Sequence, residues 1–227
     1  MKIRFALLTI AALAGSAHAQ FFSESFETAI PVASQGPPGV TIALPSGNWH
    51  ALNESNPIGT TGVFTSTLFA PVPDGTQHAA MNFNNGAGVS NLSTWFMSPN
   101  VVFNNGDTIE FWSRTVNNPS FPDRLHLKLS TAGASTASAD FTTTLLTINN
   151  GLTTGGYPSV WTQYTATISG LGGPTSGRFA FHYSVPNGGP SGSNSDFVGI
   201  DMVVYAPAPG AAALLGLGGL LAARRRR

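Results

Sequence analysis

The feature that most constrains this sequence is a period-2 alternation of apolar and polar residues, with no helical periodicity of useful length between residues 20 and 205. Residues 124–130 alternate without a break, and residues 160–168 and 178–185 follow the same pattern. Because successive side chains of a strand point to opposite faces, each segment predicts a half-buried antiparallel strand. Further strands are expected at residues 21–27, 78–83, 93–97, 108–115, 141–148 and 197–205.

The connections between these strands carry turn signals. Asn-Gly occurs at Asn85-Gly86, Asn105-Gly106 and Asn150-Gly151, and this dipeptide supplies the positive φ angles of tight turns. The Pro-rich residues 30–45 are expected to be extended and irregular. About nine strands joined by polar turns predict an all-β fold, a two-sheet antiparallel jelly-roll sandwich. The 227 residues hold one such domain, at 20–205, between appendages at 1–19 and 206–227.

Charge and cysteine content exclude several functions. The sequence has ten basic and ten acidic residues, but six of the basic ones are Lys2, Arg4 and Arg224 to Arg227 at the two ends. Four basic residues against ten acidic ones leave the body six negative charges. Nucleic acid is therefore excluded as a partner, because its phosphates require a clustered basic face. The absence of cysteine excludes disulfides and thiol chemistry.

The N-terminus has the three parts of a secretory signal. A basic start, Met1 to Arg4, precedes an apolar run at residues 5–15, and Ala17 and Ala19 form a small-x-small cleavage site. This pattern predicts a signal helix at 1–19 that signal peptidase removes before Gln20. The export machinery and signal peptidase are therefore expected partners. A buried core helix is the alternative.

The C-terminus mirrors this arrangement. A Pro-rich linker at 206–210 precedes an apolar segment at 211–223 and the four terminal arginines. Thirteen residues of helix span roughly 20 Å, short of the roughly 30 Å hydrocarbon core of a bilayer, so the predicted apolar helix is a marginal anchor. The positive-inside rule keeps the arginines in the cytoplasm and the body outside.

This tripartite tail resembles the PEP-CTERM sorting signal of bacteria. Pro207, Pro209, Gly210 and the cluster Arg224, Arg225, Arg226 and Arg227 carry the resemblance, and Pro207-Ala208-Pro209 stands where that family typically has Pro-Glu-Pro. The resemblance implies an exosortase-type sorting enzyme as a partner. It also implies transient anchoring in the inner membrane and delivery to the cell surface, outer envelope or extracellular matrix. A plain tail anchor is the alternative.

The body resembles the choice-of-anchor J domain of exported bacterial proteins. The matching stretches are Phe22 to Glu27, Trp95 to Pro99, Gly106 to Arg114, Asp123 to Leu125, Tyr157-Pro158 with Trp161, and Gly199 to Asp201. That family is similar to the jelly-roll cleaved-adhesin domains of surface proteases. The resemblance implies a binding or adhesive module and defines no ligand; extracellular polysaccharide or a surface protein is the expected partner.

A structural calcium ion is the leading hypothesis for a site. Calcium takes six to eight oxygen ligands, and the first and last strands of a jelly roll commonly lie close together. Related jelly-roll adhesins hold calcium in such a setting. The resemblance therefore implies Glu24 or Glu27 with Asp201, joined by Asp196, as ligands. Alternatively, these are edge or turn acids that are solvated or hydrogen-bonded.

Catalytic motifs are absent from the sequence: it has no nucleophile elbow, zinc-protease motif or P-loop. Glu110 and Asp123 are the pair weighed for a polysaccharide hydrolase, which needs two carboxylates across one site. His126 and His182 fall on the polar phase of their strands and are expected at the surface. Core packing is the expectation for all four tryptophans, although Trp161 and Tyr164 should face opposite sides. We expect a non-enzymatic adhesive module; a hydrolase and a passive structural protein are the alternatives.

Overall fold

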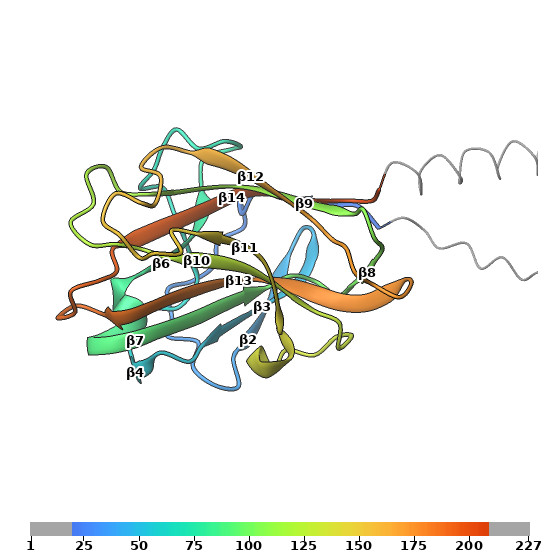
Figure 1. Cartoon of the computed structure of the whole chain (residues 1–227). Helices are drawn as coiled ribbons and strands as arrows, with labels where there is room; N and C mark the ends of the chain where they lie inside the picture. Colours follow the sequence, from blue (N-terminus) through green and yellow to red (C-terminus); the bar gives the residue numbers. More distant parts are fainter. Residues whose placement is uncertain (1–19, 209–227) are drawn as a thin grey trace, which may run out of the picture.

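The computed structural model describes residues 20–208, which form two antiparallel β-sheets packed face to face (Figure 1). This arrangement confirms the predicted all-β, two-sheet sandwich. The predicted signal helix and apolar tail helix lie outside the described residues. Within residues 20–208, no helix has the length and apolar character needed to cross a lipid bilayer.

One sheet has six strands in the order β12-β9-β14-β6-β5, with β1 pairing with β14 beyond this path. Its strands are β1 (Phe22–Glu24), β5 (Phe64–Ser66), β6 (His78–Asn82), β9 (Thr108–Thr115), β12 (Thr162–Thr167) and β14 (Phe197–Ala206). The first and last strands are hydrogen-bonded neighbours, as predicted, because Phe22 pairs with Tyr205 and Glu24 with Val203. The described chain therefore enters and leaves the sandwich at one end (Figure 1).

The other sheet has eight strands in the order β11-β10-β13-β7-β3-β2, with β4 pairing with β7 and β8 with β13. Its strands are β2 (Val40–Leu44), β3 (Gly47–Asn53), β4 (Asn56–Ile58), β7 (Gly86–Met97), β8 (Val101–Phe103), β10 (Leu125–Ser130), β11 (Thr143–Ile148) and β13 (Thr175–Gly188). Two 3-10 turns, η1 (Phe83–Asn85) and η2 (Ser138–Asp140), complete the described elements.

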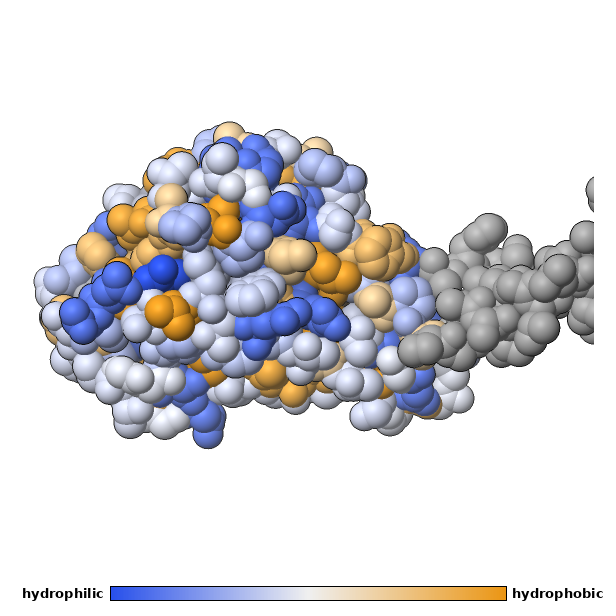
Figure 2. Space-filling model, turned by 90° about the horizontal axis from the view of Figure 1, so that it is seen from above, coloured by the Kyte–Doolittle hydropathy of each residue, from blue (hydrophilic) through white to orange (hydrophobic). Residues whose placement is uncertain are grey.

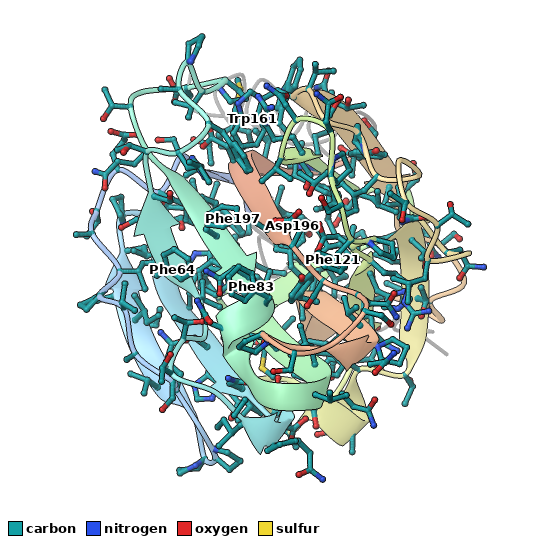
Figure 3. All side chains as sticks on the ribbon, turned by 90° about the vertical axis from the view of Figure 1, so that its left-hand side faces the viewer. Phe64, Phe83, Phe121, Trp161, Asp196 and Phe197 are labelled. Atoms are coloured by element: carbon teal, nitrogen blue, oxygen red, sulfur yellow. The ribbon has the colours of Figure 1, made fainter. Side chains whose placement is uncertain are left out.

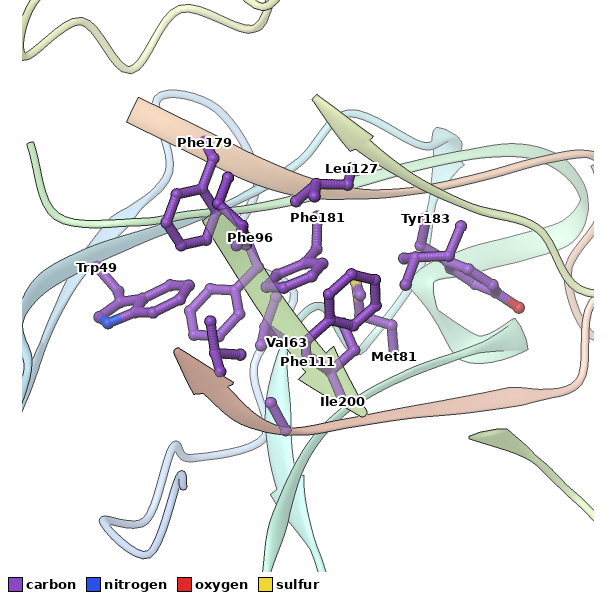
Figure 4. Close-up of a cluster of buried hydrophobic side chains, with 14 of the residues drawn as sticks. Trp49, Val63, Met81, Phe96, Phe111, Leu127, Phe179, Phe181, Tyr183 and Ile200 are labelled. Carbon is purple, nitrogen blue, oxygen red and sulfur yellow. The ribbon is translucent and has the colours of Figure 1, made fainter. Parts of the chain in front are cut away.

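The space between the sheets is filled mainly by aromatic rings (Figure 4). Trp49 is fully buried, and its ring centroid lies 4.6 Å from that of Phe96 and 5.6 Å from that of Phe26. Phe111 and Phe181 bring the two sheets into contact with centroids 4.9 Å apart. Aromatic side chains bury a large area each, so they hold together a domain that has no disulfide.

Two local predictions were wrong. Residues 30–45, expected to be irregular, contain β2. The next strand, β3, was not predicted, because it is buried on both faces and its sequence shows no alternation. Trp49 of β3 packs in the main core, while Leu52 packs with Trp95 on the outer face. Asn85-Gly86 ends η1 with an extended Gly86 (φ −112°), and around Asn150-Gly151 the positive φ angles belong to Asn149 and Leu152, so only Gly106 adopts the expected positive φ, of 94°.

Candidate functional site

The loop at residues 67–77 packs over the place where β1 meets β14 and brings three acidic residues together. Backbone N–H groups of Thr76 and Gln77 each donate to Glu27 at 2.8 Å, and the N–H of Asp74 donates to Asp201 at 3.1 Å. We call Glu27, Asp74 and Asp201 the acidic junction. Glu27 and Asp201 are thus neighbours, as the sequence suggested. Asp74 was not predicted, because its contribution depends on how a long loop folds back.

Glu24 lies beside the junction, but both oxygens of its carboxylate already accept hydrogen bonds from the protein. Its side chain is 3% exposed. One carboxylate oxygen accepts from the N–H of Phe26 at 2.9 Å, and the other accepts from the N–H and hydroxyl of Ser46 at 3.1 and 2.6 Å. The Ser46 hydroxyl in turn accepts from the indole N–H of Trp49 at 2.8 Å. Glu24 therefore ties β1 to the β2–β3 turn.

Asp201 is the unusual member of the junction. It is fully buried, and its Oδ1 has no hydrogen-bond partner. Burial raises the pKa of this carboxyl to about 7, and the negative charges of Asp74 and Glu27 add to the effect, while the N–H groups of Asp74 and Met202 oppose it. Met202 next to it has a left-handed φ of 47°, in a bulge that shifts the register of β14. The backbone is therefore strained where it presents Asp201.

The junction offers oxygen donors, which suit a hard cation such as calcium. A cavity of about 170 Å³ is lined in part by Glu24, Glu27, Asp74 and Met202. Among the described residues, no three acidic or histidine side chains converge closely enough to hold a metal by themselves. A cation at the junction would therefore have fewer than three side-chain carboxylates as ligands and would take most of its oxygens from the backbone or from water.

Asp196 is not part of the junction. It directly precedes β14 and lies five positions before Asp201, a span of roughly 17 Å along the strand. Its N–H donates to Asp123 at 2.8 Å, and its carbonyl accepts from the N–H of Phe83 at 3.0 Å. Asp196 lies instead between Phe83 and Phe121 at the other end of the sandwich (Figure 3).

A second cavity, of about 220 Å³, opens at that end, and we call it the loop-end cleft. It is lined by Phe83, Ser120, Phe121, Gly189, Pro190, Gly192, Ser195 and Asp196. Sequence analysis missed Phe83 and Phe121 as site residues. The available signal was an aromatic residue between two prolines, Pro119-Ser120-Phe121-Pro122, in a loop with no apolar periodicity.

The two carboxylates weighed for hydrolysis are not a pair. Glu110 alternates with the buried Ile109 and Phe111, so its side chain is on the outer face of β9. Asp123 is fully buried inside, where it accepts from the hydroxyls of Tyr183 and Thr115, each at 2.6 Å. Burial raises the pKa of Asp123, against these hydrogen bonds. One carboxylate faces outward and the other is enclosed, so they do not flank a common substrate position.

The histidines are less exposed than expected. His182 is half-buried on the outer face of the eight-stranded sheet and stacks on Trp95 with centroids 3.6 Å apart. Burial lowers the pKa of its neighbour His126 to about 4. His78 is fully buried, and neither ring nitrogen has a hydrogen-bond partner. Aromatic neighbours cover these polar positions, which strand alternation alone does not reveal.

Trp161, directly before β12, and Tyr164 within it face opposite sides, as predicted, whereas core packing holds for Trp49 and Trp95 but not for Trp112 and Trp161, which are only partly buried. Tyr164 stacks on the core residue Phe111 at 5.5 Å, whereas Trp161 packs edge-to-face on Phe69 at 6.0 Å outside the sandwich. The surface seen over β12 and β9 intermixes hydrophilic and hydrophobic residues (Figure 2). That face shows no continuous apolar platform.

Solved structures resemble this sandwich over most of its length. The K1 cleaved adhesin domain of Lys-gingipain from Porphyromonas gingivalis superposes with a TM-score of 0.53 at 20% identity, covering 83% of this chain and 98% of that one. This chain has the same fold as that adhesin domain. The K3 domain of the same protein matches at a TM-score of 0.49 and 16% identity, covering 82% and 97% of the two chains.

A carbohydrate-binding structure matches more distantly. The C-terminal family 6 carbohydrate-binding module of LamC from Zobellia galactanivorans gives a TM-score of 0.38 at 14% identity, over 83% of this chain and all (100%) of that one. No protein-family model and no curated protein matches the sequence. The comparisons thus establish the adhesin-type β-sandwich fold.

Proposed function

We propose that this chain is an exported, non-enzymatic binding module with an adhesive role at the cell surface or in the extracellular matrix, and that calcium at the acidic junction stabilises it. The adhesin-type fold supports the binding role, and the observation that carries the calcium part is Asp201, a fully buried carboxyl whose Oδ1 lacks a partner. An ionised carboxylate in that position is costly unless a cation or a hydrogen bond compensates it. Extracellular modules typically bind calcium at 10⁻⁴ to 10⁻³ M, so weak binding is sufficient outside the cell.

Delivery rests on the two ends of the chain. In this proposal signal peptidase cuts between Ala19 and Gln20, and the domain is a choice-of-anchor J-type module. An exosortase-type enzyme then acts at the Pro-rich segment that includes Pro207 and Pro209. Before that step, the apolar tail holds the protein transiently in the inner membrane, with Arg224 to Arg227 in the cytoplasm.

Intact mass and fractionation of the protein from its own host test this delivery. A mass ending near Pro209, with the protein outside the membrane fraction, supports proteolytic sorting. A mass that still includes Arg227, with the protein in the membrane, makes the tail a plain anchor.

The separation of Glu110 from Asp123 supports a role without catalysis. Electrophoresis through gels that contain soluble polysaccharides, followed by product analysis, tests this role in calcium and in EDTA. Retention without new products supports a binding module. Soluble products that disappear in the Glu110→Gln variant establish a hydrolase instead. No retention, with the protein still co-fractionating with matrix polymer, favours a passive structural component.

A further inference from the structure

The loop-end cleft has the composition of a ligand site. Phe121 is 41% exposed although it is a large apolar side chain, and Phe83 and Asp196 stand beside it (Figure 3). Ser120 and Ser195 are the hydroxyl residues of the lining. Few polar groups among apolar walls are typical of pockets that orient a small molecule.

Hydrogen bonds hold the cleft in shape from below. The buried carboxylate of Asp123 accepts the N–H of Asp196 at 2.8 Å, and the N–H of Ser195 donates to the carbonyl of Pro122 at 3.0 Å. The Ser195 hydroxyl accepts from the N–H of Gly189, also at 3.0 Å. The first two bonds join residues 122–123 to the loop at 189–196, and the third closes that loop on itself. A site fixed before binding loses less entropy when a ligand arrives.

The charges of the cleft select the class of ligand. Asp196 is the only ionisable residue of the lining, and burial raises the pKa of its carboxyl, while the N–H of Ser120 opposes the shift. The domain as a whole carries six negative charges between its two ends. None of the three arginines of the described residues lines the cleft: Arg124 donates to the carbonyl of Ser184 at 2.9 Å and Arg178 to that of Ala134 at 3.2 Å, while Arg114 donates to the side chain of Asn117 at 2.7 Å. An anionic polymer would be repelled from this end.

The remaining chemistry matches a sugar ring. A pyranose has apolar C–H faces, which pack on aromatic rings, and hydroxyl groups, which donate to a carboxylate and exchange hydrogen bonds with serine hydroxyls. We propose that the loop-end cleft binds an uncharged saccharide chain, with Phe121 and Phe83 packing on the sugar and Asp196 accepting from its hydroxyls. This inference rests on the proposed binding function and adds the location and ligand class.

Affinity electrophoresis of the mature domain through neutral mannan, xylan and mixed-linkage glucan, with anionic alginate as a comparison, tests the inference. At least one neutral polymer should retain the wild-type protein. Phe121→Ala and Asp196→Asn should each weaken retention about tenfold or more, which corresponds to about 1.4 kcal/mol. Phe121→Trp keeps an aromatic face at this position, so this variant should be retained more strongly than Phe121→Ala.

Phe21→Ala is the matched control, because Phe21 is also an exposed phenylalanine (63%) but lies next to β1, where the described chain enters the sandwich. It should bind like wild type. Because both phenylalanines are exposed, their alanine variants should melt within a few degrees of the parent.

Three other results overturn the inference in distinguishable ways. If a neutral polymer retains wild type, Phe121→Ala and Asp196→Asn equally, the cleft is not the site and the binding function stands. If only alginate retains the wild type, the ligand class is wrong although the protein still binds. If no polymer retains it, the proposed polysaccharide-binding role fails together with the cleft.

Discussion

Replacing Asp201 by asparagine should stabilise the domain in EDTA at pH 8, which is the reverse of the usual effect of changing a buried residue. Asparagine has nearly the shape of aspartate, keeps an oxygen to accept the N–H of Asp74, and stays neutral at every pH. The wild-type carboxyl has a folded pKa of about 7. Its unfolded pKa is about 3.9. The stability that depends on the protonated Asp201 carboxyl is therefore fully present below pH 4 and is lost as the pH rises through 7.

The size of the effect follows from that shift. A difference of about three pH units at 1.36 kcal/mol per unit corresponds to on the order of 4 kcal/mol at pH 8. For a domain of this size each kcal/mol moves the melting temperature by roughly 2–4 °C, so a gain of about 8–16 °C is expected. Calcium at 100 times its Kd would stabilise the wild type by about 2.7 kcal/mol, so it should narrow the difference between the two proteins to about a third.

Thermal unfolding of both proteins by circular dichroism, from pH 4 to 8 in EDTA and in calcium, measures this effect. Comparing the melting temperatures of the two proteins at each pH removes the contributions of groups that titrate in both, such as His78. Asp140→Asn, in η2 on the other sheet, is the control for simple loss of a carboxylate. If Asp201→Asn melts at or below the wild type in EDTA at pH 8, or if calcium raises both proteins equally, the account of the junction is wrong.

Three further predictions concern the buried side chains. His78→Phe should raise the free energy of unfolding by about 1–3 kcal/mol at pH 5. Burial lowers the pKa of His78 to about 4, so the stability that depends on the neutral imidazole is present above pH 6.5 and is lost as the pH falls through 4. Urea unfolding at pH 5 and 8 checks this. Asp123→Ala should cost about 2–4 kcal/mol in the same assay, since Tyr183 and Thr115 lose their acceptor. Trp49→Ala should cost about 3–5 kcal/mol, and an unchanged urea midpoint would contradict its central place in the core.

The strands that could be predicted are those with one face toward solvent. In β10, Leu125 and Leu127 are buried and His126 is partly exposed, which produces the alternation read from the sequence. β3 shows no such pattern, because Leu52 on its outer face is covered by Trp95 and Phe141. Whether a second layer covers a strand is decided by residues far away in the chain, so period-2 analysis cannot detect it.

The acidic junction was predictable only in part. Pairing of the first and last strands placed Glu27 and Asp201 in one region, and the structure has them there. The resemblance to jelly-roll adhesins implied Asp196 as a further ligand, but it lies five strand positions from Asp201 and lines the loop-end cleft instead. Asp74 and Phe121 lie in loops, whose course depends on contacts such as those of Glu27 with Thr76 and Gln77.

β14 begins at Phe197, directly after Asp196 of the cleft, and ends at Ala206, near the point where the described chain leaves the sandwich. It is paired with β9 along one side and with β6 and β1 along the other. A pull between a ligand in the cleft and the C-terminal side of the domain would run along this strand. Antiparallel hydrogen bonds lie perpendicular to the strand, so such a pull loads many of them at once instead of opening them in sequence. The topology therefore makes β14 the strand that carries the tension, because neighbouring strands are hydrogen-bonded to it along both edges.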